Sequence, residues 1–299
     1  MAHLAIVNDE SADLFSVLTQ WYRENARELP WREDATSAWG VLVCEVMSQQ
    51  TPVARVAPQW IEWMRRWPTP ESLAGATPAE VIIAWDRLGY PSRALRLLEC
   101  ARAVTRDYDG QLPETTEELE ALPGIGPYTA AAVVAFGYHK YSVVLDTNVK
   151  RVLARLGGDA QARAHYTKAE RERAAARVPA DDEHAWQWNQ AIMEFGALVC
   201  TASNPGCEDC PIADFCEWRK AGFPEAQPEL KRKVQKFVGT QREARGKIMA
   251  VLRTRNTDIP VPELRKESGL EVQRFDAALK SLINDHLVAE ANGQIGLPA

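Results

Sequence analysis

Apolar residues recur along most of the chain at a spacing of three and four positions. The first such segment carries Leu14, Val17, Leu18, Trp21 and Tyr22. This spacing gives an α-helix one apolar face, whereas the alternation typical of β-strands is nearly absent between residues 13 and 221. Short stretches with proline or glycine, such as 67–70 and 110–113, separate the segments. The pattern therefore predicts an all-α fold over most of the chain.

The last part of the chain follows a different pattern. Residues 222–241 contain two prolines and a basic run, which indicates a linker. Three predicted helices follow, and the third has Phe275, Ala278, Leu279, Leu282 and Ile283 on one face. Two short apolar segments then flank Asn292-Gly293, a strong signal of a β-hairpin. This order predicts a small winged-helix-like α+β domain at 242–299, for which docking, dimerisation and DNA binding are all open roles.

The composition is that of an ordinary globular protein, with 46% hydrophobic and 25% charged residues among 299. No apolar stretch is long enough to cross a membrane, so we expect a cytoplasmic protein without a membrane partner. We also expect a monomer. The net charge of −6 argues against nucleic acid binding over the whole surface. Such binding would depend on local basic patches: Lys150, Arg151 and Arg155; Lys231, Arg232, Lys233 and Lys236; or Arg242, Arg245 and Lys247.

Four of the six cysteines are clustered near residue 200. Cys200, Cys207, Cys210 and Cys216 have the spacing C-x6-C-x2-C-x5-C, and the loop between them contains prolines and a glycine. In a cytosolic protein such a cluster indicates a metal site rather than disulfides. Zinc and an iron–sulfur cluster both accept four thiolates, so the spacing alone leaves both open.

A glycine-containing turn joins two predicted helices at residues 122–130. Gly124 and Gly126 would let backbone N–H groups approach a phosphate, and the second helix would present its positive N-terminus to the same anion. The alternative is a simple turn between two helices. By itself the motif does not decide between these two interpretations.

Two acidic residues stand in positions where a carboxyl group could take part in catalysis. Asp146 follows the apolar run Val143–Leu145 and precedes a helix, so it is either an ordinary N-cap or a catalytic carboxylate. Glu45 lies among apolar neighbours on a predicted helix. Burial there would raise its pKa and let it hold a proton near neutral pH, whereas a partly exposed surface Glu is the alternative.

Taken together, residues 14–218 resemble the helix-hairpin-helix DNA glycosylases, and in particular the MutY-type adenine DNA glycosylases. The turn at 122–130 is followed at 143–152 by the segment that completes their signature, and the cysteine spacing resembles that of the endonuclease III and MutY cluster loop. The run 45–51 resembles their motif Glu-Val-Met-x-Gln-Gln-Thr, with Ser48 where leucine is usual. The resemblance implies a 4Fe-4S cluster on the four cysteines. It also implies a cluster-bearing domain at 1–37 and 146–221 and a six-helix module at 38–145.

The resemblance also assigns roles to individual residues. Asp146, with Asn148 beside it, would stabilise the positive charge that develops on the sugar, and Glu45 would protonate the adenine. Tyr128 stands where bifunctional relatives have a lysine, which implies a monofunctional enzyme without Schiff-base chemistry. The residues that the resemblance assigns to DNA contacts are Gln49, Gln50, Tyr90, Arg93, Gly124, Gly126 and Lys150.

Within this group Tyr90 would wedge into the duplex, and Arg93 would contact a phosphate. The segment around them departs from the family at Arg87 and Pro91, where glycine and a second tyrosine are usual. The departures leave the wedge itself in place.

Together these assignments predict a nucleoid-associated glycosylase of base excision repair. It would remove adenine opposite 8-oxoguanine or guanine in double-stranded DNA. Two alternatives remain open. The first is a thymine or uracil mismatch glycosylase, because thymine-mismatch glycosylases also have a tyrosine at the position of Tyr128. The second is a non-enzymatic iron–sulfur DNA-binding regulator. No segment resembles the Nudix-like C-terminal domain usual in the MutY group, so the preferred opposite base is also open.

Overall fold

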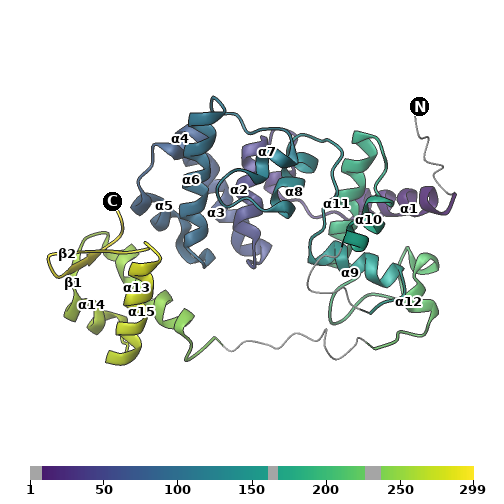
Figure 1. Cartoon of the computed structure of the whole chain (residues 1–299). Coiled ribbons are helices and arrows are strands. Elements are labelled where there is room, and N and C mark those ends of the chain that lie inside the picture. The colour runs from purple at the N-terminus through teal and green to yellow at the C-terminus, as the bar shows by residue number, and fades with distance from the viewer. Residues whose placement is uncertain (1–8, 161–167, 226–236) are drawn as a thin grey trace. The chain divides into compact units, whose positions relative to one another are not determined.

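The computed structural model describes residues 9–160, 168–225 and 237–299, and helices dominate it (Figure 1). No described residue before 226 lies in a strand, as the periodicity predicted. Among the described residues, no helix is both long enough and apolar enough to span a bilayer. The helical elements of this part are α1 (Asp9–Asn25), η1 (Pro30–Arg32), α2 (Ala38–Ser48), α3 (Val53–Arg66), α4 (Pro70–Ala74), α5 (Pro78–Trp85), η2 (Asp86–Leu88), α6 (Ser92–Asp107), α7 (Thr116–Glu120), α8 (Pro127–Gly137), α9 (Thr147–Leu156), α10 (Lys168–Ala175), α11 (Asp182–Leu198), η3 (Ala213–Phe215) and α12 (Glu217–Lys220).

The chain divides into two compact units. The first consists of Met1–Val41, Glu114–Thr116 and Gly126–Arg232, and the second of Leu42–Pro113, Glu117–Ile125 and Lys233–Ala299. Helix α8 thus groups with α9, α11 and the cysteine loop, whereas the sequence placed it in a module at 38–145. The domain boundaries expected from the sequence stay a prediction.

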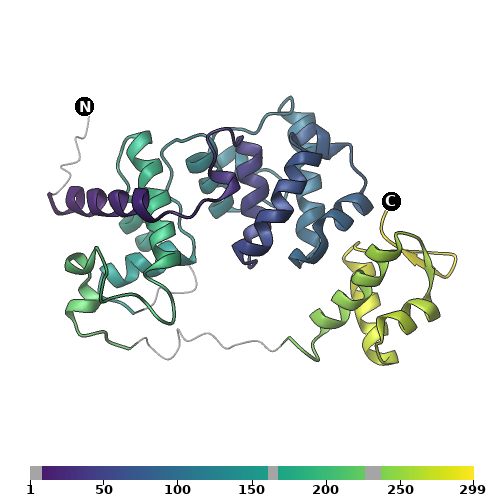
Figure 2. The same ribbon diagram turned by 180° about the vertical axis from the view of Figure 1, so that it is seen from behind.

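The first unit is built around α11, which packs against α1 and α9 (Figure 2). Its core contains Leu18 from α1, Val152 from α9 and Phe195 from α11, all almost completely buried. These are the apolar faces that the three-and-four spacing marked. The N-terminus of α11 is capped by the Asp181 side chain, which accepts from the His184 N–H at 3.0 Å.

The second unit begins with helices α2 to α6, whose core is rich in tryptophan. Trp63 and Trp85 are fully buried and meet edge to face at 5.5 Å. The Trp63 indole donates to the carbonyl of Ala84 at 2.9 Å, which satisfies its one polar atom. The Trp85 indole donates to the carbonyl of Gly89 at 2.9 Å, which ties this packing to the loop between α5 and α6.

The C-terminal part of the second unit has the predicted winged-helix order. Its elements are α13 (Gln241–Arg255), β1 (Ile259–Pro260), α14 (Val261–Ser268), α15 (Val272–Asn284), β2 (Ala289–Ala291) and β3 (Gln294–Gly296). The strands form an antiparallel sheet in the order β1-β3-β2. Asn292 and Gly293 both have positive φ, 53° and 73°, as a two-residue hairpin turn requires. The sequence missed β1, because two residues including Pro260 carry no strand periodicity.

Helices α5 and α6 contact this C-terminal domain within the same unit. Ile82 joins the apolar cluster around Phe275, and Leu95 packs against it. The guanidinium of Arg242 lies 4.4 Å from the ring centroid of Tyr90, a cation–π distance. The C-terminal domain therefore packs against the segment that carries Tyr90, the residue predicted to wedge into the duplex.

Candidate active site

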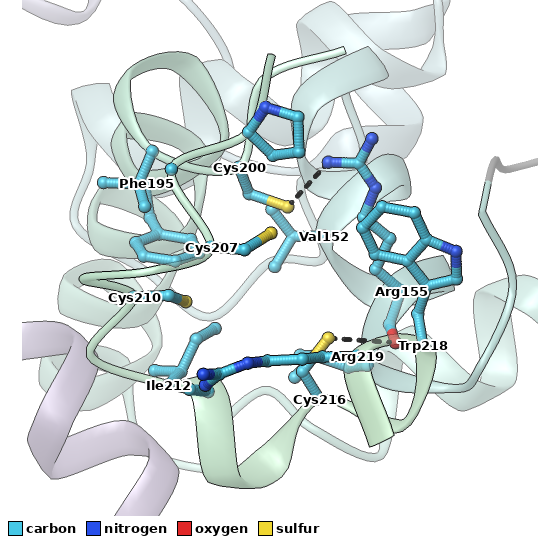
Figure 3. A pocket seen from close by; sticks show the side chains of 15 residues that line it. Val152, Arg155, Phe195, Cys200, Cys207, Cys210, Ile212, Cys216, Trp218 and Arg219 are labelled. Atoms are coloured by element: carbon cyan, nitrogen blue, oxygen red, sulfur yellow. Dashed lines mark hydrogen bonds between the residues drawn. The ribbon is translucent and has the colours of Figure 1, made fainter. Parts of the chain in front are cut away.

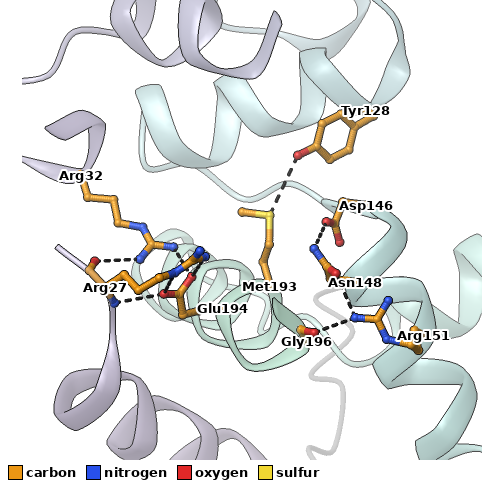
Figure 4. A network of polar contacts seen from close by, with 9 residues as sticks. All are labelled: Arg27, Arg32, Tyr128, Asp146, Asn148, Arg151, Met193, Glu194 and Gly196. Atoms are coloured by element: carbon orange, nitrogen blue, oxygen red, sulfur yellow. Dashed lines mark hydrogen bonds and ion pairs between the residues drawn. The ribbon is translucent and has the colours of Figure 1, made fainter. Parts of the chain in front are cut away.

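Asp146 caps the N-terminus of α9. Its Oδ1 accepts from the backbone N–H of Val149 at 2.6 Å, so Asp146 is an N-cap, and this is compatible with a catalytic role. Its Oδ2 accepts from the side-chain amide of Asn148 at 2.7 Å (Figure 4). Burial raises the pKa of the carboxyl, against the opposing effect of these hydrogen bonds and of the Arg151 charge. The result is a fixed carboxylate with reduced solvation, which interacts strongly with any positive charge that forms beside it.

Arg151 continues this network toward the cysteine loop. Its Nη2 donates to Asn148 Oδ1 at 2.9 Å and to the carbonyl of Gly196 at 2.6 Å, and its Nε donates to the carbonyl of Cys200 at 2.7 Å. The residue is 8% exposed, and Arg155 is 4% exposed. The sequence interpretation of these two arginines as part of a surface basic patch is therefore wrong: both serve the interior of the unit. The patch at Lys231–Lys236 lies outside the described residues.

Two residues of α11 complete this site, and sequence reasoning missed both. Met193 accepts a weak hydrogen bond from the hydroxyl of Tyr128, with oxygen and sulfur 3.9 Å apart (Figure 4). Gly196 lets α9 approach α11, because a Cβ added there would lie 2.8 Å from Cβ of Asn148. Both residues follow ordinary helical spacing, so nothing in the sequence marked them.

The hairpin between α7 and α8 uses its two glycines differently. Gly124 has φ +78°, and an added Cβ would lie 2.9 Å from Cβ of Arg96. Gly126 is the N-cap of α8 with φ −105°, and its missing side chain would point into open space. The N-terminus of α8, the positive end of the helix dipole, lies at this glycine. This geometry suits an anion, and the phosphate contact stays a prediction.

The remaining predicted residues are distributed over both units. Lys150 is half-buried on α9 in the first unit. In the second unit Glu45 is half-buried on α2, and Gln49 and Gln50 are exposed just after the end of that helix. Tyr90 is 39% exposed in the α5–α6 loop.

Arg93 was expected at a phosphate, but its guanidinium is enclosed by protein. The residue is 8% exposed, and both Nη atoms donate to groups of α2 and of the neighbouring loops. This burial argues against the phosphate contact that the sequence suggested.

The four clustered cysteines line one pocket (Figure 3). In the part of the chain that the structure describes, no three His, Cys, Asp or Glu side chains converge closely enough to hold a single metal ion. Zinc binds four thiolates directly, with each sulfur about 2.3 Å from the ion. An iron–sulfur cluster instead sits inside a wider ring of four thiolates. Four thiols that line one pocket are a donor set that fits such a cluster.

Arg155 lies against this pocket. Its Nη1 donates to Cys200 Sγ at 3.2 Å, and its guanidinium stacks 4.6 Å from the ring centroid of Trp218. The thiol of Cys216 in turn donates to the Arg155 carbonyl at 3.5 Å. A cation next to a ligand sulfur balances the negative charge that four thiolates bring together.

Comparison with protein families gives two matches. Residues 43–177 match the HhH-GPD superfamily of base excision DNA repair proteins. Residues 200–216 match the iron–sulfur binding domain of endonuclease III, and this range begins and ends at the first and last clustered cysteines. The predicted helix-hairpin-helix fold and iron–sulfur cofactor are confirmed.

Individual proteins extend these matches. The chain is 44% identical over 283 residues to the adenine DNA glycosylase of Mycobacterium tuberculosis, which covers 94% of this chain and 92% of that protein. It is 39% identical over 211 residues to the human adenine DNA glycosylase, or 68% of this chain and 39% of that protein. The solved structure of a thermostable thymine-DNA glycosylase is 26% identical and superposes with a TM-score of 0.65, covering 72% of this chain and 100% of that one. The mycobacterial match covers so much of the chain that it includes most of the C-terminal domain.

Proposed function

The chain belongs to the adenine DNA glycosylases of the helix-hairpin-helix superfamily, and we propose that it hydrolyses the N-glycosidic bond of adenine mispaired with 8-oxoguanine or guanine in double-stranded DNA. The observation that carries this proposal is the carboxylate of Asp146, held by Val149 N–H and the Asn148 amide on the first turn of α9. The carboxylate is fixed and partly desolvated, which is what a sugar cation requires of its partner.

The reaction begins with adenine extruded from the duplex, because its glycosidic bond is inaccessible in the stack. As the bond breaks, positive charge develops at C1′, and Asp146 stabilises that cation or captures it covalently, as carboxylates do in retaining glycosidases. Asn148 and the N–H of Val149 hold the carboxylate in one orientation. Its position is therefore set before DNA binds.

Departure of adenine requires a proton, which we assign to Glu45. It lies on α2 among the buried residues Leu42, Cys44 and Val46, so its carboxyl group is attached to an apolar part of the helix. Tyr128 has no amine with which to attack the sugar, so water completes the reaction. The expected product is an abasic site in an intact strand.

Cys200, Cys207, Cys210 and Cys216 would hold the iron–sulfur cluster, which gives the 200–216 loop a fixed conformation when it is bound. The loop in turn supplies the Cys200 carbonyl that accepts from Arg151. The four cysteines and their loop thus position α9 and the DNA-facing surface. They take no part in bond cleavage.

A direct test uses purified protein and five duplexes: adenine opposite 8-oxoguanine, opposite guanine and opposite thymine, and thymine or uracil opposite guanine. Alkali-dependent strand cleavage scores base release, and Asp146→Asn is the control. Adenine release that the variant lacks supports the proposal, and the ratio between the first two duplexes gives the opposite-base preference. Release of thymine or uracil alone would identify a pyrimidine mismatch glycosylase, and no release would favour a DNA-binding regulator.

A further inference from the structure

Arg93 caps the C-terminal end of α2 from a distant part of the sequence. Its Nη1 donates to the carbonyls of Val46, Met47 and Gln49 at 2.8, 3.2 and 2.7 Å. The first two carbonyls belong to the last turn of the helix, where no intrahelical N–H is available to them. The third belongs to Gln49, one of the residues assigned to DNA. One nitrogen therefore fixes both the helix end and the loop that follows.

The second terminal nitrogen of Arg93 holds a different loop. Its Nη2 donates to the carbonyls of Leu88 and Gly89 at 3.2 and 2.9 Å, directly before the wedge residue Tyr90. It also donates to the hydroxyl of Thr51 at 3.2 Å, and that hydroxyl donates to the Leu88 carbonyl at 3.1 Å. The guanidinium thus bridges the loop after α2 and the loop before α6.

Both loops carry backbone conformations that need support. Gln50 has φ +56° and Tyr90 has φ +48°. Residues other than glycine rarely adopt a positive φ. Such conformations persist only where the surrounding structure holds them. In each case the carbonyl of the preceding residue, Gln49 or Gly89, accepts from Arg93.

The position requires arginine rather than any cation. Burial lowers the pKa of Arg93 to about 10, so the guanidinium remains charged at neutral pH and its hydrogen bonds are charge-assisted. Two Nη atoms in a planar fork reach acceptors on two sides, whereas a lysine ammonium is a single point. A lysine would keep the charge and lose the bridge.

We propose that Arg93 is a positioning residue for the DNA-facing loops: it fixes the loop of Gln49 and Gln50 relative to the loop of Tyr90 and contacts no phosphate. This rests on the proposed function, which assigns the residues of these loops to DNA contacts. Its consequence is specific. Loss of the bridge should impair recognition of the lesion, whereas the general attraction to DNA should remain.

The test compares Arg93→Lys and Arg93→Met with matched changes of Arg106, on the same helix with its side chain 70% exposed. For each protein we would measure single-turnover adenine release, affinity for lesion and undamaged duplexes, and the salt dependence of affinity. Thermal unfolding establishes that each variant is folded. The salt dependence separates the two roles, because each lost phosphate contact lowers the slope of log affinity against log salt by about 0.9.

Arg93→Lys is expected to release adenine about 100-fold more slowly, a typical cost of misplaced contacts, and to lose preference for the lesion duplex. Its affinity for undamaged DNA, and the salt slope of Arg93→Met, should equal those of the wild type and of the Arg106 variants. Wild-type behaviour of Arg93→Lys combined with a lower slope for Arg93→Met would instead establish a phosphate contact and overturn the proposal. Unchanged lesion preference and release in both variants would overturn it as well.

Two safeguards keep the outcome interpretable. If Arg93→Met does not fold, Arg93→Lys still decides, because a phosphate contact tolerates lysine and a bridge does not. If the wild type releases no adenine, the proposed function is wrong. The effect of Arg93 on the affinity ratio between lesion and undamaged duplexes is a separate measurement.

Discussion

The Nε of Arg151 donates to the carbonyl oxygen of Cys200 at 2.7 Å. The same guanidinium donates to Asn148, which in turn donates to Asp146. The first cysteine of the cluster loop and the proposed catalytic carboxylate are therefore joined through two side chains. We expect a change at either end to reach the other by displacing a shared hydrogen-bond partner.

Arg151→Gln should consequently impair both ends of this network. We expect adenine release to fall about 10- to 100-fold, as is usual when a residue that orients a metal ligand or catalytic group is lost. Iron content and visible absorbance should fall in the same preparation. The exposed Arg173→Gln on α10 serves as control. A variant with full iron content and full activity would contradict the coupling.

Asp146→Asn should lower the rate of adenine release by at least about 100-fold. The N-terminus of α9 should stay capped, since asparagine is an equally good N-cap. The wild type should lose activity toward low pH, because the carboxylate must be ionised. Burial raises the pKa of Asp146, so this loss begins at a higher pH than an ordinary aspartate would give. A raised carboxyl pKa makes protonation favourable to the folded state, so protonation of Asp146 does not itself destabilise the fold. Circular dichroism alongside the pH–rate profile checks this.

The two hairpin glycines should respond differently to alanine. Gly124→Ala meets both a positive φ and the nearby Arg96, so it should lower thermal stability and DNA affinity together. Gly126→Ala has an allowed φ and open space around its Cβ, so stability should be unchanged. If the open space is where a phosphate approaches, DNA affinity falls in Gly126→Ala as well. Equal affinity to wild type would place the phosphate elsewhere.

Arg155→Met should shift the reduction potential of the bound cluster to lower values. The guanidinium donates to Cys200 Sγ at 3.2 Å, and hydrogen bonds and positive charge at ligand sulfurs favour the more reduced, more negative cluster. Voltammetry of the protein, free and on DNA, measures the shift. An unchanged potential with an intact visible spectrum would show that the contact between Arg155 and Cys200 does not tune the cluster.

Glu194→Ala should destabilise the first unit. The carboxylate is 1% exposed and is paired with Arg27 at 2.7 Å and Arg32 at 2.8 Å. Burial acts to raise the pKa of Glu194, but the hydrogen bonds from the two arginines outweigh it and lower the pKa to about 2. Removing the carboxylate leaves Arg27 and Arg32 without their anionic partner. The free energy of unfolding, measured with denaturant, should fall by about 3 to 5 kcal/mol.

The lowered pKa of Glu194 also has a pH consequence. Because the carboxyl pKa is lower in the folded state, its stabilising effect is present above the ordinary value of 4.5 and disappears as pH falls toward 2. The difference in unfolding free energy between the wild type and Glu194→Ala should shrink over that interval. A constant difference would mean that the pair contributes through packing rather than charge.

The sequence by itself determined the features that depend on local order along the chain. Three-and-four periodicity gave the helices, Asn292-Gly293 gave the hairpin of the winged helix, and the cysteine spacing gave the cluster loop. Asp146 and the hairpin glycines were also identified, because caps and turns are encoded within a few residues.

The tertiary structure alone decided what the buried arginines do. Arg93, Arg151 and Arg155 looked like basic surface residues, yet each donates to carbonyls or sulfur brought close only by folding. The contacts of Met193 with Tyr128 and of Gly196 with Asn148 likewise arise only on folding. A side chain's charge is visible in sequence, but some of its acceptors lie far along the chain, 47 positions away for Arg93 with Val46 and 49 for Arg151 with Cys200. No periodicity or short motif records contacts at that separation, because they arise from the packing of one helix against another.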